Sequence, residues 1–370
     1  MPDFHRPTFG FTRPFAVDSK LFDVKLKRDS DLPQDLRHRN TMKLPTYCIV
    51  IVCIACTIAI NSRANGQTFR VVAYLPNWSG LQTMAEKIDY SKLTHINIAF
   101  ENPINDLGEM SFRPDTAVLI EAAHQHKVSV LVSIGGGSAS EDSTMIARYR
   151  KLLSPEQRQA FVKKLGDFVV EHKFDGIDVD IEGPAIDESY GPFIEALSAE
   201  LRPRGKLLTA ALSKGYGGSK VPNSVFEYFD FLNIMAYDAV GSWNPNQAGQ
   251  HSSLEFSKEN VDYWLQRGLP KEKAVLGLPF YGYGFGADFV PGGISYNAIL
   301  ERHPGAETVD EIGSTIWYNG IPTIKLKTSY AMRESLGGVM IWSLEQDATG
   351  DKSLLQSITE ALQKRESVAR

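Results

Sequence analysis

The order of apolar and polar residues divides the chain beyond residue 68 into alternating strand-like and helix-like segments. Eight short runs are rich in β-branched and other apolar residues and are bounded by polar or turn-forming residues, which predicts strands. These runs cover residues 69–78, 94–100, 128–137, 174–183, 206–213, 229–238, 273–284 and 336–347.

The segments between the runs have the apolar spacing of amphipathic helices. Segment 154–173 opens with Ser154 as a candidate cap and Pro155 at the first helical position, and further helices are predicted at 188–202 and 259–268. Strands that alternate with helices pair in parallel, and eight such strands close a barrel. We therefore predict an α/β fold, namely a (β/α)8 TIM barrel.

An apolar run near the N-terminus predicts a secretory signal. Residues 44–60 have an apolar centre of about 14 residues, follow Lys43 and lead into small residues that end at Gly66. A membrane-spanning helix needs about 20 apolar residues. We therefore predict a cleaved signal peptide at 42–66, with an uncleaved anchor as the alternative.

The predicted signal divides the chain into three parts. Signals begin at the first residue of a protein, so residues 1–41 are predicted to be a mis-called extension, with translation starting at Met42. Residues 67–370 would then form the barrel domain of a secreted or periplasmic protein without stable membrane insertion. The three cysteines lie within the signal, so no disulfide framework is expected beyond it: they are Cys48, Cys53 and Cys56.

Composition and charge narrow the class of partner. The chain is 43% hydrophobic and 22% charged with a formal net charge of -5, which is an ordinary globular balance. It has no run rich in lysine and arginine, and phosphate contacts need concentrated positive charge. Nucleic acid is therefore not expected as a partner, and a neutral or weakly charged substrate fits better.

The run FDGIDVDIEG at 174–183 places carboxylates in a strand that should be buried. Side chains alternate along a strand, so Asp178, Asp180 and Glu182 share one face, which looks into the barrel. Barrel enzymes place their chemistry at the C-terminal ends of the strands, where Glu182 lies. Like charges so close hold a proton among them, which predicts Glu182 as a general acid. The alternative is a metal site or salt bridges with barrel lysines, but no histidine accompanies these acids.

These acids also carry a family resemblance. The pattern D-x-x-D-x-D-x-E of glycoside hydrolase family 18, the chitinases and their relatives, is present as Asp175, Asp178, Asp180 and Glu182, so residues 69–347 resemble that family. Further matches are S-x-G-G at Ser133, Gly135 and Gly136, M-x-Y-D at Met235, Tyr237 and Asp238, the strand-ending tryptophan at Trp342, and GLPFYG at 277–282.

The resemblance implies substrate-assisted hydrolysis with retention of configuration, an exception to the two-carboxylate scheme. Glu182 would protonate the glycosidic oxygen and later activate water, while the 2-acetamido carbonyl of the sugar would act as nucleophile. Asp180 would orient the acetamido nitrogen, Asp178 would share a proton with Asp180, and Tyr237 would donate to the acetamido oxygen. Such a site needs one acid, one orienting carboxylate and one donor, and no cofactor or metal.

Other residues are expected to bind sugar or to support the motifs. Trp342 is expected to be a sugar platform rather than core, because sugar C–H faces pack on aromatic rings, and Trp243 is expected to line the leaving-group side. Trp78 stays open between platform and core. Met235, Asp238 and Tyr281 complete the predicted binding set. Asp175, Ser133, Gly135 and Gly136 are expected to be structural, the glycines through close backbone packing.

Some positions depart from the family pattern and leave rivals open. Ile181 stands where many chitinases have Trp, and Tyr283 stands where Arg is common. The connection of about 50 residues between the seventh and eighth runs is predicted to hold the seventh helix and a modest insertion, too small for the complete α+β insertion of exo-acting members. We therefore expect a shallow groove and endo-type cleavage of chitin or chitooligosaccharides by a monomer. The rivals are an endo-β-N-acetylglucosaminidase acting on the chitobiose core of N-glycans and a carbohydrate-binding protein without hydrolytic activity.

Overall fold

The computed structural model describes residues 69–369. The predictions for residues 1–41, for the signal at 42–66 and for its three cysteines lie outside these described residues. Within the described part, no helix is long and apolar enough to cross a membrane.

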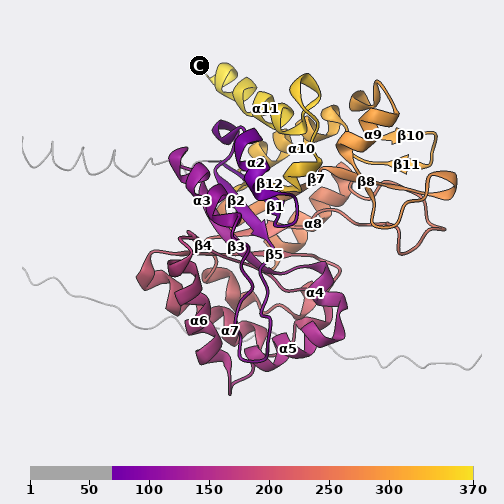
Figure 1. The fold of residues 1–370 in the computed structure, drawn as a ribbon. Helices are drawn as coiled ribbons and strands as arrows, with labels where there is room; N and C mark the ends of the chain where they lie inside the picture. The colour runs from indigo at the N-terminus through magenta and orange to yellow at the C-terminus, as the bar shows by residue number, and fades with distance from the viewer. Residues whose placement is uncertain (1–68, 370) are drawn as a thin grey trace, which may run out of the picture. The chain divides into compact units, whose positions relative to one another are not determined.

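Eight parallel strands close into a barrel, which confirms the predicted (β/α)8 architecture (Figure 1). Around the barrel each strand pairs with two neighbours in the order β1-β12-β7-β6-β5-β4-β3-β2. The strands are β1 (Arg70–Pro76), β2 (His95–Ala99), β3 (Ser129–Gly135), β4 (Gly176–Asp180), β5 (Leu207–Leu212), β6 (Phe231–Ile234), β7 (Ala274–Pro279) and β12 (Gly338–Trp342). All eight lie within the runs predicted from the alternation of residue types.

Helices cover the outside of the barrel (Figure 1). They are α2 (Leu81–Lys87), α3 (Thr116–Gln125), α4 (Gly137–Glu141), α5 (Ser143–Leu153), α6 (Arg158–Glu171), α7 (Tyr190–Leu201), α8 (Leu254–Gln266), α10 (Ile321–Arg333) and α11 (Leu354–Ala369). In the segment from β5 to β6 the structure has only 3-10 turns, Gly218–Lys220 and Asn223–Glu227. The main core lies between the strands and these helices, and outward residues such as Ile177 and Val179 are fully buried in it.

The predicted start of the helix at 154–173 is wrong. The helix α6 begins at Arg158, and Ser154 is instead the C-terminal cap of α5, with its backbone N–H donating to Lys151 O. The carbonyl of Ser154 accepts from the N–H groups of Gln157 and Arg158, so residues 154–157 form a turn between two helices. A serine followed by proline is compatible with either arrangement, so the local sequence does not distinguish the start of a helix from a turn that follows one.

The seventh apolar run, 273–284, divides into two strands that belong to different sheets. Residues 274–279 form β7 of the barrel, and Tyr281–Gly284 form β8 of a small antiparallel sheet with the order β10-β11-β8-β9. This sheet and the helix α9 (Tyr296–Arg302) make up the insertion before α10, as Figure 1 shows beside the barrel. Its other strands are β9 (Ile294–Ser295), β10 (Glu311–Ile312) and β11 (Ile316–Trp317). The predicted modest insertion is therefore present, as a small α+β unit.

Candidate active site

Strand β4 delivers the acidic side chains to the inside and the mouth of the barrel. Asp178 and Asp180 are buried, while Glu182 follows the strand by two residues and is partly exposed. The neighbours Ile177, Val179 and Ile181 face the outer core, as alternation along a strand requires.

Asp178 is the most heavily hydrogen-bonded of these acids. Its Oδ2 accepts from the hydroxyls of Tyr74 at 2.6 Å and Ser133 at 2.8 Å. Its Oδ1 accepts from the hydroxyl of Thr209 at 2.6 Å and from Nδ2 of Asn233 at 3.2 Å. Burial raises the pKa of Asp178, and these donors act against that shift by stabilising the charged form. Donors from β1, β3, β5 and β6 therefore fix this carboxylate at the centre of the barrel.

Burial and neighbouring negative charges disfavour the charged forms of Asp180 and Glu182. Oδ1 of Asp180 is buried and has no hydrogen-bond partner among the described residues. Burial, and then the charges of Glu182 and Asp178, raise the pKa of Asp180 well above its ordinary value. Burial, and then the charges of Asp238 and Glu141, raise the pKa of Glu182 to about 7. A carboxyl at the barrel mouth therefore keeps a proton near neutral pH, as a general acid requires.

Glycines at the end of β3 let the backbone approach Asp180 closely. Gly135 pairs with Asp180 across the two strands and has a φ of 103°, and a Cβ there would lie 2.3 Å from the carbonyl oxygen of Asp180. The N–H of Gly136 donates to that same oxygen at 2.8 Å, and a Cβ on Gly136 would meet the ring of Phe100. Side chains larger than hydrogen do not fit at these positions, so the S-x-G-G turn holds the backbone of Asp180.

A second acidic group lies at the mouth after β6. Oδ1 of Asp238 accepts from the hydroxyls of Tyr281 at 2.5 Å and Tyr283 at 3.1 Å, and Nδ1 of the buried His251 lies 3.4 Å from it. Both tyrosines belong to β8, so the insertion reaches into the mouth of the barrel. Tyr237 is buried with its ring edge-on to Tyr281, and burial, followed by the charge of Asp180, raises its pKa well above 10. Tyr237 is therefore a neutral hydroxyl at physiological pH.

A sequence model of the glycosyl hydrolases family 18 matches residues 70–347. The chain belongs to this family. Among solved structures, this family 18 chain is similar to the GH18 chitinase ChiB from the chitin utilization locus of Flavobacterium johnsoniae, with 38% identity and a TM-score of 0.75 over 81% of this chain and 95% of that one. It is also similar to a GH18 chitinase from Cycas revoluta in complex with (GlcNAc)3, with 26% identity and a TM-score of 0.69 over 79% of this chain and 99% of that one.

Curated relatives show the same similarity over part of their length. Probable chitinase 10 of Drosophila melanogaster is 28% identical over 352 residues, which are 75% of this chain and 15% of that protein. Relatives from Moniliophthora roreri and Brugia malayi are matched over 64% and 55% of their own lengths. The chain thus spans less than two thirds of these relatives.

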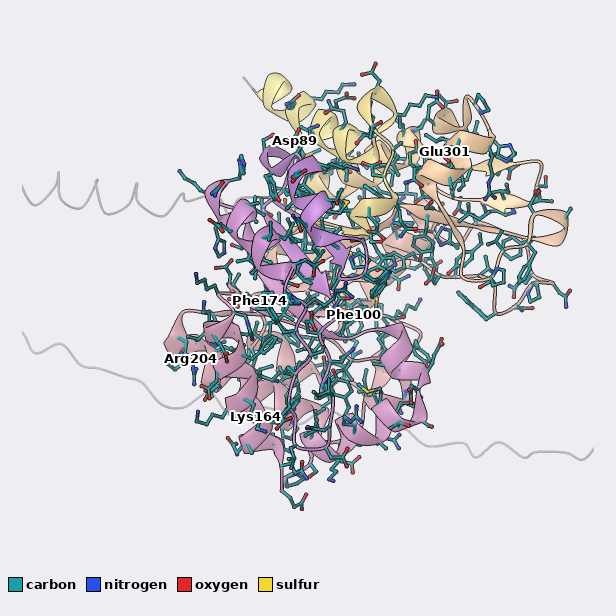
Figure 2. The ribbon with its side chains drawn as sticks, in the orientation of Figure 1. Asp89, Phe100, Lys164, Phe174, Arg204 and Glu301 are labelled. Carbon is teal, nitrogen blue, oxygen red and sulfur yellow. The ribbon has the colours of Figure 1, made fainter. Side chains whose placement is uncertain are left out.

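Trp342 and Trp243 each contact a tyrosine that donates a hydrogen bond to one of the acids, Asp178 and Asp238 respectively. Trp342 ends β12 and contacts Phe100, near the centre of Figure 2, with ring centroids 5.8 Å apart, and Tyr74 at 5.4 Å. Trp243 and Trp78 are exposed by 61% and 64%, so neither is a core residue. Trp243 stands edge-on to Tyr283, with ring centroids 5.6 Å apart.

The remaining motif residues lie at the edge of the site or away from it. Met235 is partly buried against the inner aromatic cluster. Asp175 precedes β4, where its Oδ2 accepts from the backbone N–H of Val130 at 2.7 Å and lies 2.8 Å from Nε2 of His124. It links β4 to β3 and α3 rather than contributing to the mouth. Among residues 69–369, no group of histidine, cysteine, aspartate and glutamate side chains is arranged to hold a metal ion.

Several residues of the site were missed from the sequence. Tyr74, Thr209 and Asn233 contact Asp178 from three different strands, and no local pattern marks them. Asn102 donates from Nδ2 to the carbonyl of Gly135 at 3.0 Å and accepts from the N–H of Gly135 at 2.7 Å. Its only sequence signal is its place just after the second predicted strand, where barrel enzymes carry functional residues.

Proposed function

We propose that this chain hydrolyses β-1,4-linked N-acetylglucosamine in chitin or chitooligosaccharides, with retention of configuration and by endo-type cleavage. The observation that carries the proposal is the Asp180–Glu182 pair. The pKa of Glu182 is about 7, and the buried Oδ1 of Asp180 has no hydrogen-bond partner among the described residues. Relatives described as chitinases, and a similar structure described as a complex with (GlcNAc)3, support the choice of substrate.

The proposed reaction borrows its nucleophile from the substrate. Glu182 transfers its proton to the glycosidic oxygen, while the acetamido carbonyl oxygen bonds to the anomeric carbon and the bond to the leaving sugar breaks. Asp180 accepts the acetamido N–H through its unpartnered Oδ1, and the neutral hydroxyl of Tyr237 donates to the acetamido oxygen. The Glu182 carboxylate then takes a proton from water, whose oxygen displaces the acetamido oxygen from the same face that the leaving sugar occupied.

The surrounding residues are assigned to sugar binding. Trp342 forms the floor beside the acids, and the exposed ring of Trp243 is positioned to stack on a second sugar. Asp238 and Tyr281 offer polar contacts to hydroxyls, with Met235 and Trp78 at the edge. A secreted or periplasmic monomer that takes soluble oligomers fits this assignment.

The test compares wild-type protein with Glu182→Gln on chitohexaose and on an N-glycosylated protein, with products followed by mass spectrometry. We expect short chitooligosaccharides from wild type, and a loss of kcat/KM of about 10²–10⁴-fold in Glu182→Gln, because the amide cannot transfer a proton. Folding of both proteins is checked by circular dichroism. Chitohexaose that is shortened only in two-sugar steps from one end would contradict endo-type cleavage.

Other outcomes would assign a different function. Deglycosylation that leaves one N-acetylglucosamine on asparagine would identify an endo-β-N-acetylglucosaminidase. Folded wild-type protein that binds chitohexaose without cleaving it would identify a carbohydrate-binding protein.

A further inference from the structure

The segment that joins β6 to α8 folds back beside the M-x-Y-D motif. Oγ of Ser252 donates to the carbonyl oxygen of Ala236 at 2.7 Å. The carbonyl of His251 accepts from the N–H of Ala239 at 3.0 Å. One contact therefore lies just before Tyr237 in the chain, and the other lies two residues after it. Both Ser252 and His251 are fully buried.

The backbone between these two contacts has a conformation that needs support. Asp238 has a φ of 64°, in the left-handed region that residues other than glycine rarely adopt. Such a residue keeps this conformation only where its surroundings impose it. The ring of Tyr237 packs against β7, where a Cβ on Gly277 would lie 3.0 Å from its Cε1. Packing therefore restrains the ring from one side, and the two hydrogen bonds hold the main chain before and after it.

Ser252 is itself held by a buried network. Nζ of Lys327 donates to its Oγ at 2.7 Å, so the hydroxyl accepts one hydrogen bond and gives its own proton to the carbonyl of Ala236. Its N–H donates to Oε1 of Gln250 at 3.1 Å, and its carbonyl accepts from Nζ of Lys327 at 2.6 Å and Nδ2 of Asn319 at 2.9 Å. A buried network in which every group has a partner is rigid. Ser252 is therefore a fixed support for the strand end after β6.

We propose that Ser252 is a positioning residue: it holds the main chain at Ala236 and thereby places the hydroxyl of Tyr237 for its contact with the acetamido oxygen. This inference rests on the proposed function, in which Tyr237 donates to that oxygen. The acetamido oxygen must lie against the anomeric carbon for the new bond to form. A displaced Tyr237 hydroxyl would leave less of the bound substrate in the geometry that reacts.

The experiment measures kcat and KM for chitohexaose with wild-type protein and Ser252→Ala. We expect kcat to fall about 10-fold and KM to change less than about two-fold, because other contacts still bind the sugar. Ser257→Ala is the matched control. Ser257 on α8 is also fully buried, and its Oγ donates to a main-chain carbonyl, that of Ser253, at 2.9 Å. Removing this equivalent hydrogen bond should leave kcat at the wild-type value.

A double-mutant cycle tests whether Ser252 acts through Tyr237. Tyr237→Phe removes the donor and should by itself lower kcat about 10²-fold. In that background Ser252→Ala should lower kcat less than about two-fold, because no hydroxyl is left to position. Ser252→Cys is a second variant, whose thiol fills the site and donates weakly. It should show an intermediate loss of kcat, and it decides the test by the same cycle if Ser252→Ala does not fold, as checked by circular dichroism.

The outcomes separate the two proposals. Folded wild-type protein that leaves chitohexaose intact would overturn the proposed function and this inference with it. Cleavage by the wild type, together with equal kcat values in the Ser252 variants and Ser257→Ala, would overturn this inference alone. A loss of kcat that is equally large with and without the Tyr237 hydroxyl would also contradict it, because Ser252 would then act through another group.

Discussion

At the residue scale, the acidity of Glu182 depends on its neighbours more than on its own chemistry. Burial is the largest cause of its raised pKa, and the charges of Asp238 and Glu141 come next. Asp238 lies in the segment after β6, and Glu141 ends α4, which follows β3, so segments that follow three barrel strands together determine whether one carboxyl keeps its proton. A glutamate in water would have lost that proton well below neutral pH.

The pH at which kcat/KM falls should therefore depend on the charge of Asp238. We expect kcat/KM of the wild type to fall as pH rises through about 7, because Glu182 loses the proton that the leaving group needs. In Asp238→Asn a charge that raises the pKa of Glu182 is removed, so the alkaline limb should move to lower pH. The position of the limb, rather than the absolute rate, is measured with chitohexaose between about pH 5 and 9.

The control for this profile is Glu301→Gln, which removes an equal charge from an exposed position on α9. Glu301 contributes to none of the pKa shifts described at the mouth. Its limb should coincide with that of the wild type. An alkaline limb at the wild-type pH in Asp238→Asn would show that the charge of Asp238 does not raise the pKa of Glu182.

At the element scale, the ends of β2, β3 and β4 act as one unit. Asn102, just after β2, forms hydrogen bonds with both the N–H and the carbonyl of Gly135 at the end of β3. The hydroxyl of Tyr149 on α5 donates to Oδ1 of Asn102, the atom that also accepts from the N–H of Gly135. Gly135 in turn lies against the carbonyl of Asp180 on β4. The backbone of a catalytic candidate is thus positioned by contacts that begin on two other elements.

Glycine at position 135 should be required for stability. Gly135→Ala places a Cβ 2.3 Å from the carbonyl oxygen of Asp180 at a φ of 103°, so we expect the free energy of unfolding to fall by about 2 kcal/mol or more. Urea denaturation followed by fluorescence measures the change. Gly137→Ala is the matched control, because an added Cβ there meets no atom within 4 Å. Equal stability of the two variants would show that the backbones of β3 and β4 separate to admit the Cβ without a loss in the free energy of unfolding.

At the scale of the whole molecule, a buried lysine connects the segment after β6 to the C-terminal end of the insertion. Nζ of Lys327 on α10 donates to the carbonyl and the hydroxyl of Ser252 at 2.6 and 2.7 Å and to Oδ1 of Asn319 at 2.7 Å. Ser252 precedes α8 and its hydroxyl donates to the carbonyl of Ala236, next to Tyr237. The insertion is thereby tied to the strand end that carries the M-x-Y-D motif.

This lysine should make stability depend on pH. Burial lowers the pKa of Lys327 from 10.5 to about 7, so between these values the folded state binds fewer protons than the unfolded state and stability rises with pH. Between pH 7 and 9, we expect the free energy of unfolding of the wild type to increase relative to Lys327→Met by about 2 kcal/mol.

Urea denaturation at both pH values measures this difference for wild type and variant. Lys325→Met is the control, because Lys325 lies on the same helix, is partly exposed and pairs with Glu360 at the surface. Its difference from the wild type should not change with pH. A pH-independent difference for Lys327→Met would mean that Lys327 keeps its charge in the folded state.

Local patterns were enough to predict the eight strands and the acidic face of β4, because alternation along a strand depends only on neighbours in the chain. The family motif likewise predicted Glu182, Asp180, Asp178 and Tyr237 as the catalytic residues, and these roles stay predictions. Where a local pattern fits two arrangements, the prediction failed: Ser154 and Pro155 form a turn between two helices, and the run at 273–284 is divided between two sheets.

Tertiary structure alone decided which distant residues act on the acids. The donors to Asp178 come from four strands spread over residues 74 to 233, and closure of the barrel is what brings them within hydrogen-bond distance. The pKa of Glu182 likewise depends on burial and on charges that the chain places far from it in sequence. The sequence by itself determined which groups can transfer protons, because that is a property of residue type and local alternation. Their protonation and their partners required the fold, because burial and charge act through space rather than along the chain.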